Sequence, residues 1–252
     1  MTAIMCARFT ASFEFREIKV RFNLQSDLPL FARRYNIAPS QEVPVIVQNG
    51  GVNKLERMRW GLVPSWATDP SIGNRMINAR AETISEKPSF RRLVERQRCL
   101  IPADGFYEWR REGNRRVPVW FYLKKKEPFA FAGLWDVWRD VEGEVLHTFT
   151  IITTAPNNLL HRIHNRMPVI CDPLQAKQWL DPRLSTRAAD IAAVLAPFPS
   201  ELMESHDVSP LVNKPEFDSA GLHRSDLRCA VTACLAGPGS GREFFQSSYH
   251  VL

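Results

Sequence analysis

The chain has 252 residues, of which 44% are hydrophobic and 10% aromatic, so it can build a packed core and is not disordered throughout. The net charge of +6 suits an acidic partner such as DNA or RNA, although charge alone favours the simpler interpretation of a soluble basic protein. No apolar run approaches the ~18 residues of a transmembrane helix, and residues 1–11 lack the apolar core of a secretory signal.

The first part of the chain predicts strands and one hairpin. Residues 6–15 mix apolar and polar side chains and predict a strand, whereas residues 27–34 are turn-like. Residues 43–48 and 55–60 predict a hairpin, because an Asn-Gly-Gly turn signal lies between them.

The middle of the chain predicts a loop, a helix and several strands. Residues 61–75 are rich in Gly, Pro and Ser and predict a loop. Residues 89–98 carry apolar side chains at the i, i+3, i+4 spacing of an amphipathic helix. Turn-forming residues then separate four strand-like runs, at residues 117–123, 129–135, 148–154 and 167–171.

Two short helices are expected after these strands. Asp172 is typical of a helix N-cap and Pro173 of a first turn, so a helix is predicted from there to Leu180. A second helix is predicted over residues 186–195, because Pro197 follows it.

The order of these elements indicates the fold class. The strands follow one another without the alternating helices of a parallel α/β sheet, so mainly antiparallel pairing is expected. We predict an α+β fold, with one compact domain over residues 6–221 that has a barrel-like or folded β-sheet and flanking helices. Residues 222–252 contain a Gly-Pro-Gly-Ser-Gly run without periodicity and predict a poorly ordered tail.

The five cysteines show neither a framework spacing nor a C-x-x-C pair, which indicates free thiols in a reducing compartment. A zinc site from His223, Cys229, Cys234 and His250 fits no common finger spacing, so we expect no metal. We expect no other cofactor either.

Cys6 would differ chemically from the other cysteines if the residues before it were removed. It would then carry an α-amine and a thiol on adjacent carbons. Because an α-amine has a pKa near ~8, part of it is unprotonated at neutral pH. Such a pair can trap an aldehyde as an imine and close a five-membered thiazolidine ring.

Four other clusters place functional side chains among turn-forming or aromatic neighbours. Each also has a simpler structural interpretation. Asn78 can cap a turn, Glu108 can be an ordinary surface carboxylate, and His164 can be a structural histidine. Trp66 can be a core residue. Spacing alone does not bring these residues together, so both interpretations stay open at this point.

Seven motifs occur here in the order seen in one protein family. They are Cys6-Ala7-Arg8-Phe9, Tyr35-Asn36-Ile37-Ala38-Pro39, Trp60-Gly61-Leu62-Val63-Pro64, Ile77-Asn78-Ala79-Arg80-Ala81-Glu82, Cys99-Leu100-Ile101-Pro102-Ala103-Asp104-Gly105-Phe106-Tyr107-Glu108-Trp109, His164-Asn165-Arg166-Met167-Pro168 and Val208-Ser209-Pro210-Leu211-Val212-Asn213. Through these motifs the chain resembles the SOS response-associated peptidase (SRAP) family of abasic-site processing proteins, over residues 6–221.

The resemblance implies a compact α+β domain that captures abasic sites in single-stranded DNA through a covalent protein–DNA crosslink. Cys6 corresponds to the terminal cysteine that forms the thiazolidine. Asn78 corresponds to the asparagine that positions the cysteine and the sugar. Glu108 corresponds to the acid/base that helps to open the sugar ring, and His164 to the histidine that assists proton transfer and reversal.

The resemblance also implies a positively charged groove for the DNA strand. Arg8, Arg80 and Arg166 align with arginines near the DNA backbone, where guanidinium groups suit phosphates. For Arg80 and Arg166 we prefer DNA contact to a structural ion pair. Trp66 can stack on a base beside the lesion, or pack in the core.

The implied partner is single-stranded DNA that contains abasic sites, including DNA at replication forks. The resemblance implies a monomeric, cytoplasmic protein of the SOS response that associates with the nucleoid when bound to DNA, without a membrane. An imine at the sugar also acidifies the neighbouring carbon, so strand cleavage by β-elimination (AP-lyase activity) is an expected side reaction.

Two features depart from the family pattern. Ala7 stands where the family usually has glycine, and its methyl group can slow capture. Residues 1–5 precede Cys6, so either translation begins at Met5 or the leader is cleaved, since an acylated nitrogen forms no imine. Two alternatives therefore stay open: a cysteine-type peptidase that acts on itself or on other chains, and a noncovalent binder of single-stranded or modified DNA.

Overall fold

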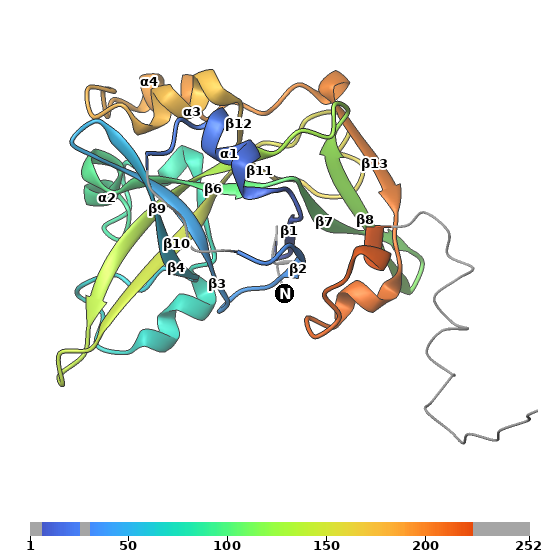
Figure 1. Ribbon diagram of the computed structural model, residues 1–252, viewed down its shortest axis with the longest axis horizontal. Coiled ribbons are helices and arrows are strands. Elements are labelled where there is room, and N and C mark those ends of the chain that lie inside the picture. Colours follow the sequence, from blue (N-terminus) through green and yellow to red (C-terminus); the bar gives the residue numbers. More distant parts are fainter. Residues whose placement is uncertain (1–6, 26–30, 224–252) are drawn as a thin grey trace, which may run out of the picture.

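The computed structural model describes residues 7–25 and 31–223 (Figure 1). Cys6 and residues 224–252 of the expected tail lie outside the described residues, so the predicted boundary after residue 221 stays a prediction. The described residues form one domain with mainly antiparallel sheets and a few helices, which confirms the expected α+β class. None of the helices within these ranges is long and apolar enough to cross a membrane.

Five long strands form a closed barrel at the centre of the domain. They are β3 (Glu42–Asn49), β4 (Val52–Trp60), β6 (Arg98–Ala103), β9 (Phe129–Arg139) and β10 (Val145–Thr154). The strands pair in the order β10, β4, β3, β6, β9, and β9 pairs again with β10. The β4–β10 pairing is parallel and the others around the ring are antiparallel, so the expected barrel is confirmed.

A second antiparallel sheet packs beside the barrel. Its strands are β1 (Phe9–Ala11), β2 (Arg34–Ile37), β7 (Gly105–Glu112), β8 (Arg115–Leu123) and β13 (Met203–Asp207). They pair in the order β13-β8-β7-β1-β2, so the short N-terminal strand lies inside the sheet, between β7 and β2.

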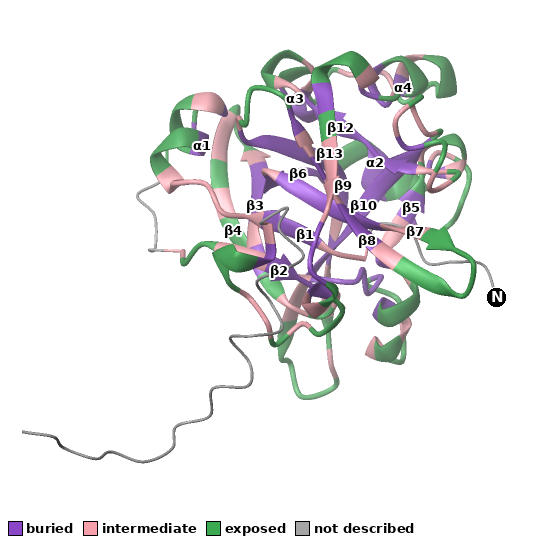
Figure 2. Ribbon diagram, turned by 90° about the vertical axis from the view of Figure 1, so that its right-hand side faces the viewer, coloured by how far each residue is buried: buried purple, intermediate pink, exposed green. Residues whose placement is uncertain are grey.

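Aromatic side chains join this sheet to the barrel. The Phe9 ring of β1 lies 5.2 Å from Trp60 of β4 and 5.7 Å from Phe131 of β9, measured between ring centroids. All three side chains are almost completely buried. Figure 2 shows the buried strands at the centre, with exposed helices and loops around them. The contact holds β1 against the barrel.

Three short strands complete the barrel edge: β5 (Asn78–Arg80), β11 (Met167–Pro168) and β12 (Ile170–Cys171). The expected single strand over residues 167–171 is therefore wrong. β11 pairs with β10, whereas β12 pairs with β9. Val169 between them donates its N–H to the Ile152 carbonyl (2.9 Å) and accepts from the Ala132 N–H (3.0 Å), so the segment crosses from one strand to the other.

In the described part of the chain, four α-helices lie outside the sheets: α1 (Phe15–Arg21), α2 (Arg91–Arg96), α3 (Pro173–Leu180) and α4 (Ala188–Val194). The predicted start of α3 is confirmed, because the Asp172 carboxylate accepts the Gln175 N–H at 2.8 Å in a capping box. α4 lies within the predicted residues 186–195. α2 is shorter than the predicted residues 89–98, because Arg98 already belongs to β6.

Two other predictions need correction. The strand expected over residues 6–15 spans only β1 within the described residues, since α1 begins at Phe15 with Glu14 in a capping box. The loop expected over residues 61–75 contains a 3-10 helix at Pro70–Arg75, which Asp69 caps by accepting the Ser71 N–H at 2.8 Å. Short 3-10 helices also occur at Ala81–Thr83, Ser200–Leu202, Pro210–Asn213 and Ala220–His223.

Candidate active site and DNA-contacting residues

The N-terminal strand leads directly to a buried carboxylate. Phe9 lies opposite Phe106 in the β1–β7 ladder, and the Tyr107 N–H donates to the Arg8 carbonyl at 3.0 Å. Continuing the antiparallel register by two residues from the Phe9–Phe106 pair puts Ala7 across from Glu108. Cys6 itself lies outside the described residues and directly precedes Ala7 in the sequence.

Glu108 is 3% exposed, so the interpretation as an ordinary surface carboxylate is wrong. It lies in β7, opposite Val119 of β8. Because side chains alternate along a strand, Glu108 shares the inward face of β7 with Phe106, which packs on Phe131 of the barrel. A carboxyl group held away from water among aromatic neighbours can donate or accept a proton at an adjacent reactant.

Asn78 belongs to the barrel side of the domain. It begins β5 and pairs in parallel with Ile151 of β10. The preceding residue, Ile77, accepts a 2.9 Å hydrogen bond from the Trp60 indole N–H, and Trp60 contacts Phe9 of β1. Two contacts therefore link Asn78 to the strand that leads to Cys6. The half-buried amide can donate and accept hydrogen bonds without a change in charge.

His164 ends a turn region that packs on the same core. Its N–H donates to the Leu160 carbonyl at 2.9 Å, and the neighbouring Ile163 packs against the core cluster that Ala7 also contacts. The His164 Nδ1 atom accepts the Arg166 N–H at 3.2 Å. Nδ1 is therefore unprotonated in this arrangement, and the proton of a neutral ring resides on Nε2.

Arg166 forms an ion pair, which is the interpretation that we placed second. Its guanidinium binds both carboxylate oxygens of Glu82, at 2.5 and 2.7 Å, and donates to the Thr153 carbonyl at 2.6 Å. Arg166 holds the pKa of Glu82 below its usual value, mainly through these hydrogen bonds. DNA contact by Arg166 stays a prediction, and any such contact must share the guanidinium with Glu82.

Arg8 is half-buried at the start of β1. Its Nη2 donates to the Asn213 carbonyl at 3.2 Å, whereas its buried Nε and Nη1 atoms have no hydrogen-bond partner among residues 7–25 and 31–223. Burial lowers the pKa of Arg8, and the nearby Glu216 opposes this effect. The Trp109 indole donates to the Asn213 side chain at 2.7 Å, so the last motif meets the first and the fifth here.

Arg80 and Trp66 face solvent. Arg80 is exposed at the end of β5 and forms no ion pair within the described part of the chain. Trp66 is 61% exposed, so the interpretation as a core residue is wrong. DNA contact by either residue stays a prediction.

The sequence interpretation missed several partners of these side chains. Asn213, Glu82 and Glu216 surround the arginines, and Thr153 supplies a carbonyl. Asn213 and Glu82 end two of the quoted motifs, so a signal for them was present. Glu216 and Thr153 lie outside every motif, and only the fold brings them near.

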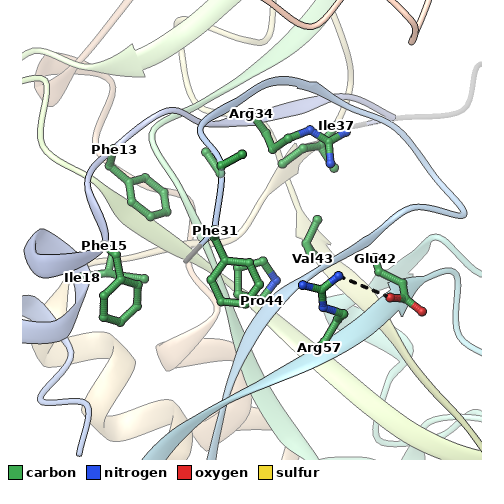
Figure 3. A pocket seen from close by; sticks show the side chains of 12 residues that line it. Phe13, Phe15, Ile18, Phe31, Arg34, Ile37, Glu42, Val43, Pro44 and Arg57 are labelled. Atoms are coloured by element: carbon green, nitrogen blue, oxygen red, sulfur yellow. Dashed lines mark ion pairs between the residues drawn. The ribbon is translucent and has the colours of Figure 1, made fainter. Parts of the chain in front are cut away.

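An aromatic pocket lies at the other end of β1 (Figure 3). Its wall includes Phe13, Phe15 and Phe31, with an Arg57–Glu42 ion pair of 3.9 Å at one side. None of the predicted site residues lines it. This pocket is therefore separate from the candidate site.

The described residues hold no cluster of three or more His, Cys, Asp or Glu side chains that could bind a metal ion. Cys99 and Cys171 are fully buried, and burial raises the pKa of both thiols, that of Cys171 to about 12. These two thiols are therefore poor nucleophiles at neutral pH.

Comparison with known proteins gives the family. The sequence profile of the SOS response associated peptidase (SRAP) family matches residues 5–215. The chain is 47% identical over 224 residues to the "Abasic site processing protein YoqW" of Bacillus subtilis (strain 168), covering 88% of this chain and 100% of that relative. It is 46% identical over 215 residues to "Abasic site processing protein YobE" of the same organism, covering 84% and 98%.

A solved structure shows the same fold. The X-ray structure of a protein from Bacteroides thetaiotaomicron superposes with a TM-score of 0.78 at 31% identity, covering 88% of this chain and 99% of that chain. The chain belongs to the SOS response associated peptidase family.

Proposed function

We propose that this protein processes abasic sites in single-stranded DNA by forming a covalent crosslink through a thiazolidine on Cys6. The names of its relatives support the class of reaction. The structural observation that supports it most is the β1–β7 register, which puts the buried Glu108 across from the residue bonded to Cys6. A reactive N-terminus beside a buried proton donor is what this chemistry requires.

The proposed reaction joins Cys6 to the open-chain aldehyde of the abasic sugar. The α-amine adds to the aldehyde carbon, and the adduct loses one water to give an imine. The thiol sulfur then adds to the same carbon, and its proton moves to the nitrogen. The product is a five-membered thiazolidine, and the whole sequence releases one water.

Three side chains have distinct roles in this proposal. Glu108 opens the sugar ring by exchanging protons with the ring oxygen and the hydroxyl group. Asn78 holds the amine and the sugar by hydrogen bonds. His164 transfers a proton at the sugar through Nε2, since Nδ1 is occupied by the Arg166 N–H.

The arginines and the exposed tryptophan hold the strand in this proposal. Arg8 and Arg80 bind phosphates, for which Arg8 has buried donors without partners among the described residues. Arg166 contributes positive charge while it remains bound to Glu82. Trp66 stacks on a base beside the lesion.

Two further activities follow from the same groups. β-Elimination from the imine cleaves the strand, and ring closure by the thiol suppresses it. Capture also needs a free α-amine on Cys6, so any residues before Cys6 must be removed. We propose that the site performs this peptide cleavage on its own chain. The Cys6 thiol adds to the Met5 carbonyl carbon, the C–N bond breaks as the Cys6 nitrogen takes up a proton, and water hydrolyses the resulting thioester to free the thiol and the leader's carboxylate.

The proposal is tested by mixing the protein with single-stranded DNA that carries one abasic site, followed by denaturing gel electrophoresis. The protein used must have Cys6 as its first residue. A stable adduct is expected, and Cys6→Ala and undamaged DNA should give none. Retardation of the DNA on a native gel without a covalent adduct would support the noncovalent DNA binder instead. Cleavage of an unrelated peptide would support a general peptidase.

A further inference from the structure

Trp66 is exposed on a loop whose backbone is firmly held. On one side, the Ser65 N–H donates to the Asp136 carboxylate at 2.8 Å and the Ala67 N–H to the Pro64 carbonyl at 2.9 Å. On the other, the Ala67 carbonyl accepts the Trp138 indole N–H at 2.7 Å. The loop is therefore fixed immediately before and after Trp66.

The start of this loop is equally constrained. Gly61 has a φ of +124°, and a Cβ atom on it would lie 2.7 Å from the Gly73 carbonyl oxygen. The loop and the 3-10 helix at Pro70–Arg75 thus touch backbone to backbone, which only glycine permits at Gly61. An indole that stays 61% exposed on such a rigid support is typical of a binding hot spot.

A polar cavity of ≈ 350 Å³ lies beside Trp66. Arg92 and Arg96 of α2 line it and share one helix face, since they are four residues apart. Both are exposed, and neither forms an ion pair or a side-chain hydrogen bond with the described residues. Two donor-rich cations therefore stand next to an exposed aromatic ring.

Two carboxylates also line the cavity, Asp136 and Glu95. Asp136 is buried and accepts the N–H groups of Ser65 and Val137 and the Gln97 amide. The negative charge of Asp136 is thus already stabilised by hydrogen bonds within the cavity wall. Glu95 is exposed on α2 and offsets one of the two arginines, so the open rim keeps a net positive charge.

We propose that this cavity extends the Trp66 contact of the proposed function into a nucleotide subsite. Arg92 and Arg96 bind the phosphate next to the base that stacks on the Trp66 indole. An aromatic face beside guanidinium groups is the recurring way to hold single-stranded nucleic acid without reading its sequence. The inference rests on the proposed function, because it takes DNA as the ligand.

The salt dependence of binding to undamaged single-stranded DNA tests the subsite. Each phosphate neutralised on a single strand contributes ~0.7 to the slope of log K against log salt, so Arg92→Ala/Arg96→Ala should reduce the slope by about 1.4 if each arginine neutralises one phosphate. Arg92→Lys/Arg96→Lys should keep most of the slope. Trp66→Ala should weaken binding by roughly tenfold with an unchanged slope.

A matched control is available on the β7–β8 hairpin. Arg115 and Arg116 are also exposed and form no ion pair within the described ranges. Figure 1 places this hairpin and α2 at opposite ends of the molecule. Arg115→Ala/Arg116→Ala should leave the slope as in the wild type. An equal loss of slope in both double variants would reduce the effect to net charge and overturn the subsite.

Other outcomes are equally decisive. An unchanged slope in Arg92→Ala/Arg96→Ala, in a protein that still forms the abasic-site adduct, overturns the subsite and leaves the proposed function standing. No adduct in the wild type overturns the proposed function, while the slope on undamaged DNA still tests the subsite. If free deoxyadenosine monophosphate binds through these arginines and the strand does not, the ligand is a mononucleotide and the proposal is wrong.

Discussion

Two arginines in this domain, one buried and one half-buried, differ in whether the fold supplies hydrogen-bond partners for their guanidinium groups. Arg98 begins β6 and is 6% exposed. Its Nη1 and Nη2 atoms donate to the carbonyls of Val94 (3.0 Å) and Asp181 (2.6 Å), and its guanidinium lies 5.6 Å from the Trp179 ring centre. Arg8 directly precedes β1, and two of its three guanidinium nitrogen atoms are buried without partners among the described residues. Burial lowers the pKa of both.

The contrast separates a structural from a binding role. A buried donor without a partner costs about 1–3 kcal/mol, so it is kept where a ligand supplies the missing acceptor. Arg98 links α2 to the residue that follows α3, and its charge is satisfied by the fold itself. Arg8 lies at the end of β1 that leads to Cys6, where a DNA phosphate would supply acceptors.

The largest expected effect is on the rate of adduct formation when the buried carboxylate of Glu108 is replaced. Glu108→Gln keeps the shape of the side chain but removes its ability to exchange a proton. The rate of adduct formation with abasic DNA should fall by ~10²–10⁴-fold, the usual contribution of general acid–base catalysis. Quenched-flow sampling on denaturing gels measures this rate, and a loss below threefold would exclude Glu108 as the proton donor.

Arg98→Met should lower the stability of the protein and leave the rate of adduct formation unchanged. The substitution leaves the Val94 and Asp181 carbonyls without their donor, so the free energy of unfolding should fall by about 2–4 kcal/mol. The adduct rate of the folded protein should stay as in the wild type. Urea unfolding and the gel assay measure the two quantities. A strong loss of rate with unchanged stability would break the comparison.

His223 tests whether a buried polar atom without a partner always indicates a binding role. Its buried Nε2 has no partner within the described part of the chain, yet its ring stacks on Trp120 at 4.0 Å between centroids and also packs against Tyr35 and Tyr107. Burial, together with His206, lowers the pKa of His223 to about 4. We assign His223 a packing role, so its substitution should change the free energy of unfolding and not the rate of adduct formation.

The direction in which pH changes the free energy of unfolding through His223 follows from proton uptake. Below its ordinary pKa of 6.5 the unfolded histidine binds a proton that the folded one refuses until about pH 4. The stabilisation is therefore complete above pH 6.5 and lost as the pH falls towards 4. Between pH 7 and 5 the wild type should lose about 2 kcal/mol more than His223→Phe in urea unfolding. Equal losses would contradict the assignment.

The smallest effect is expected at Arg8. Arg8→Gln removes one phosphate contact, so the slope of log K against log salt should fall by ~0.7, with roughly tenfold weaker binding at moderate salt. Stability should change little, because the buried Nε and Nη1 donors have no partner among the described residues and only the Nη2 hydrogen bond to the Asn213 carbonyl is lost. Arg98→Met serves as the matched control and should leave the slope unchanged. A destabilised Arg8→Gln with normal DNA binding would reverse the two roles.

Much of the architecture could be predicted from the sequence. The β3–β4 hairpin has a clear turn signal, and the α3 N-cap acts as expected. β6 was missed because all six of its residues are buried, so it shows no alternation. β13 was missed because its residues, Met203-Glu204-Ser205-His206-Asp207, are mostly polar, as an edge strand permits.

The candidate site was harder to predict from the sequence. The motif resemblance named Glu108 and Asn78, but neither spacing nor periodicity indicated which strands hold them. Their placement depends on long-range pairings, β1 with β7 and β5 with β10. The parallel β5–β10 pairing in particular was not expected, because it connects segments about seventy residues apart with no local signal.

The central claim is that the N-terminal residue of the active form traps the abasic sugar. Mass spectrometry of the purified adduct, digested with protease and nuclease, tests this most directly. The account predicts a peptide that begins at Cys6 and carries the sugar remnant, with the mass of one water lost on joining. An adduct on any other residue, or on a chain that still carries residues before Cys6, would contradict it.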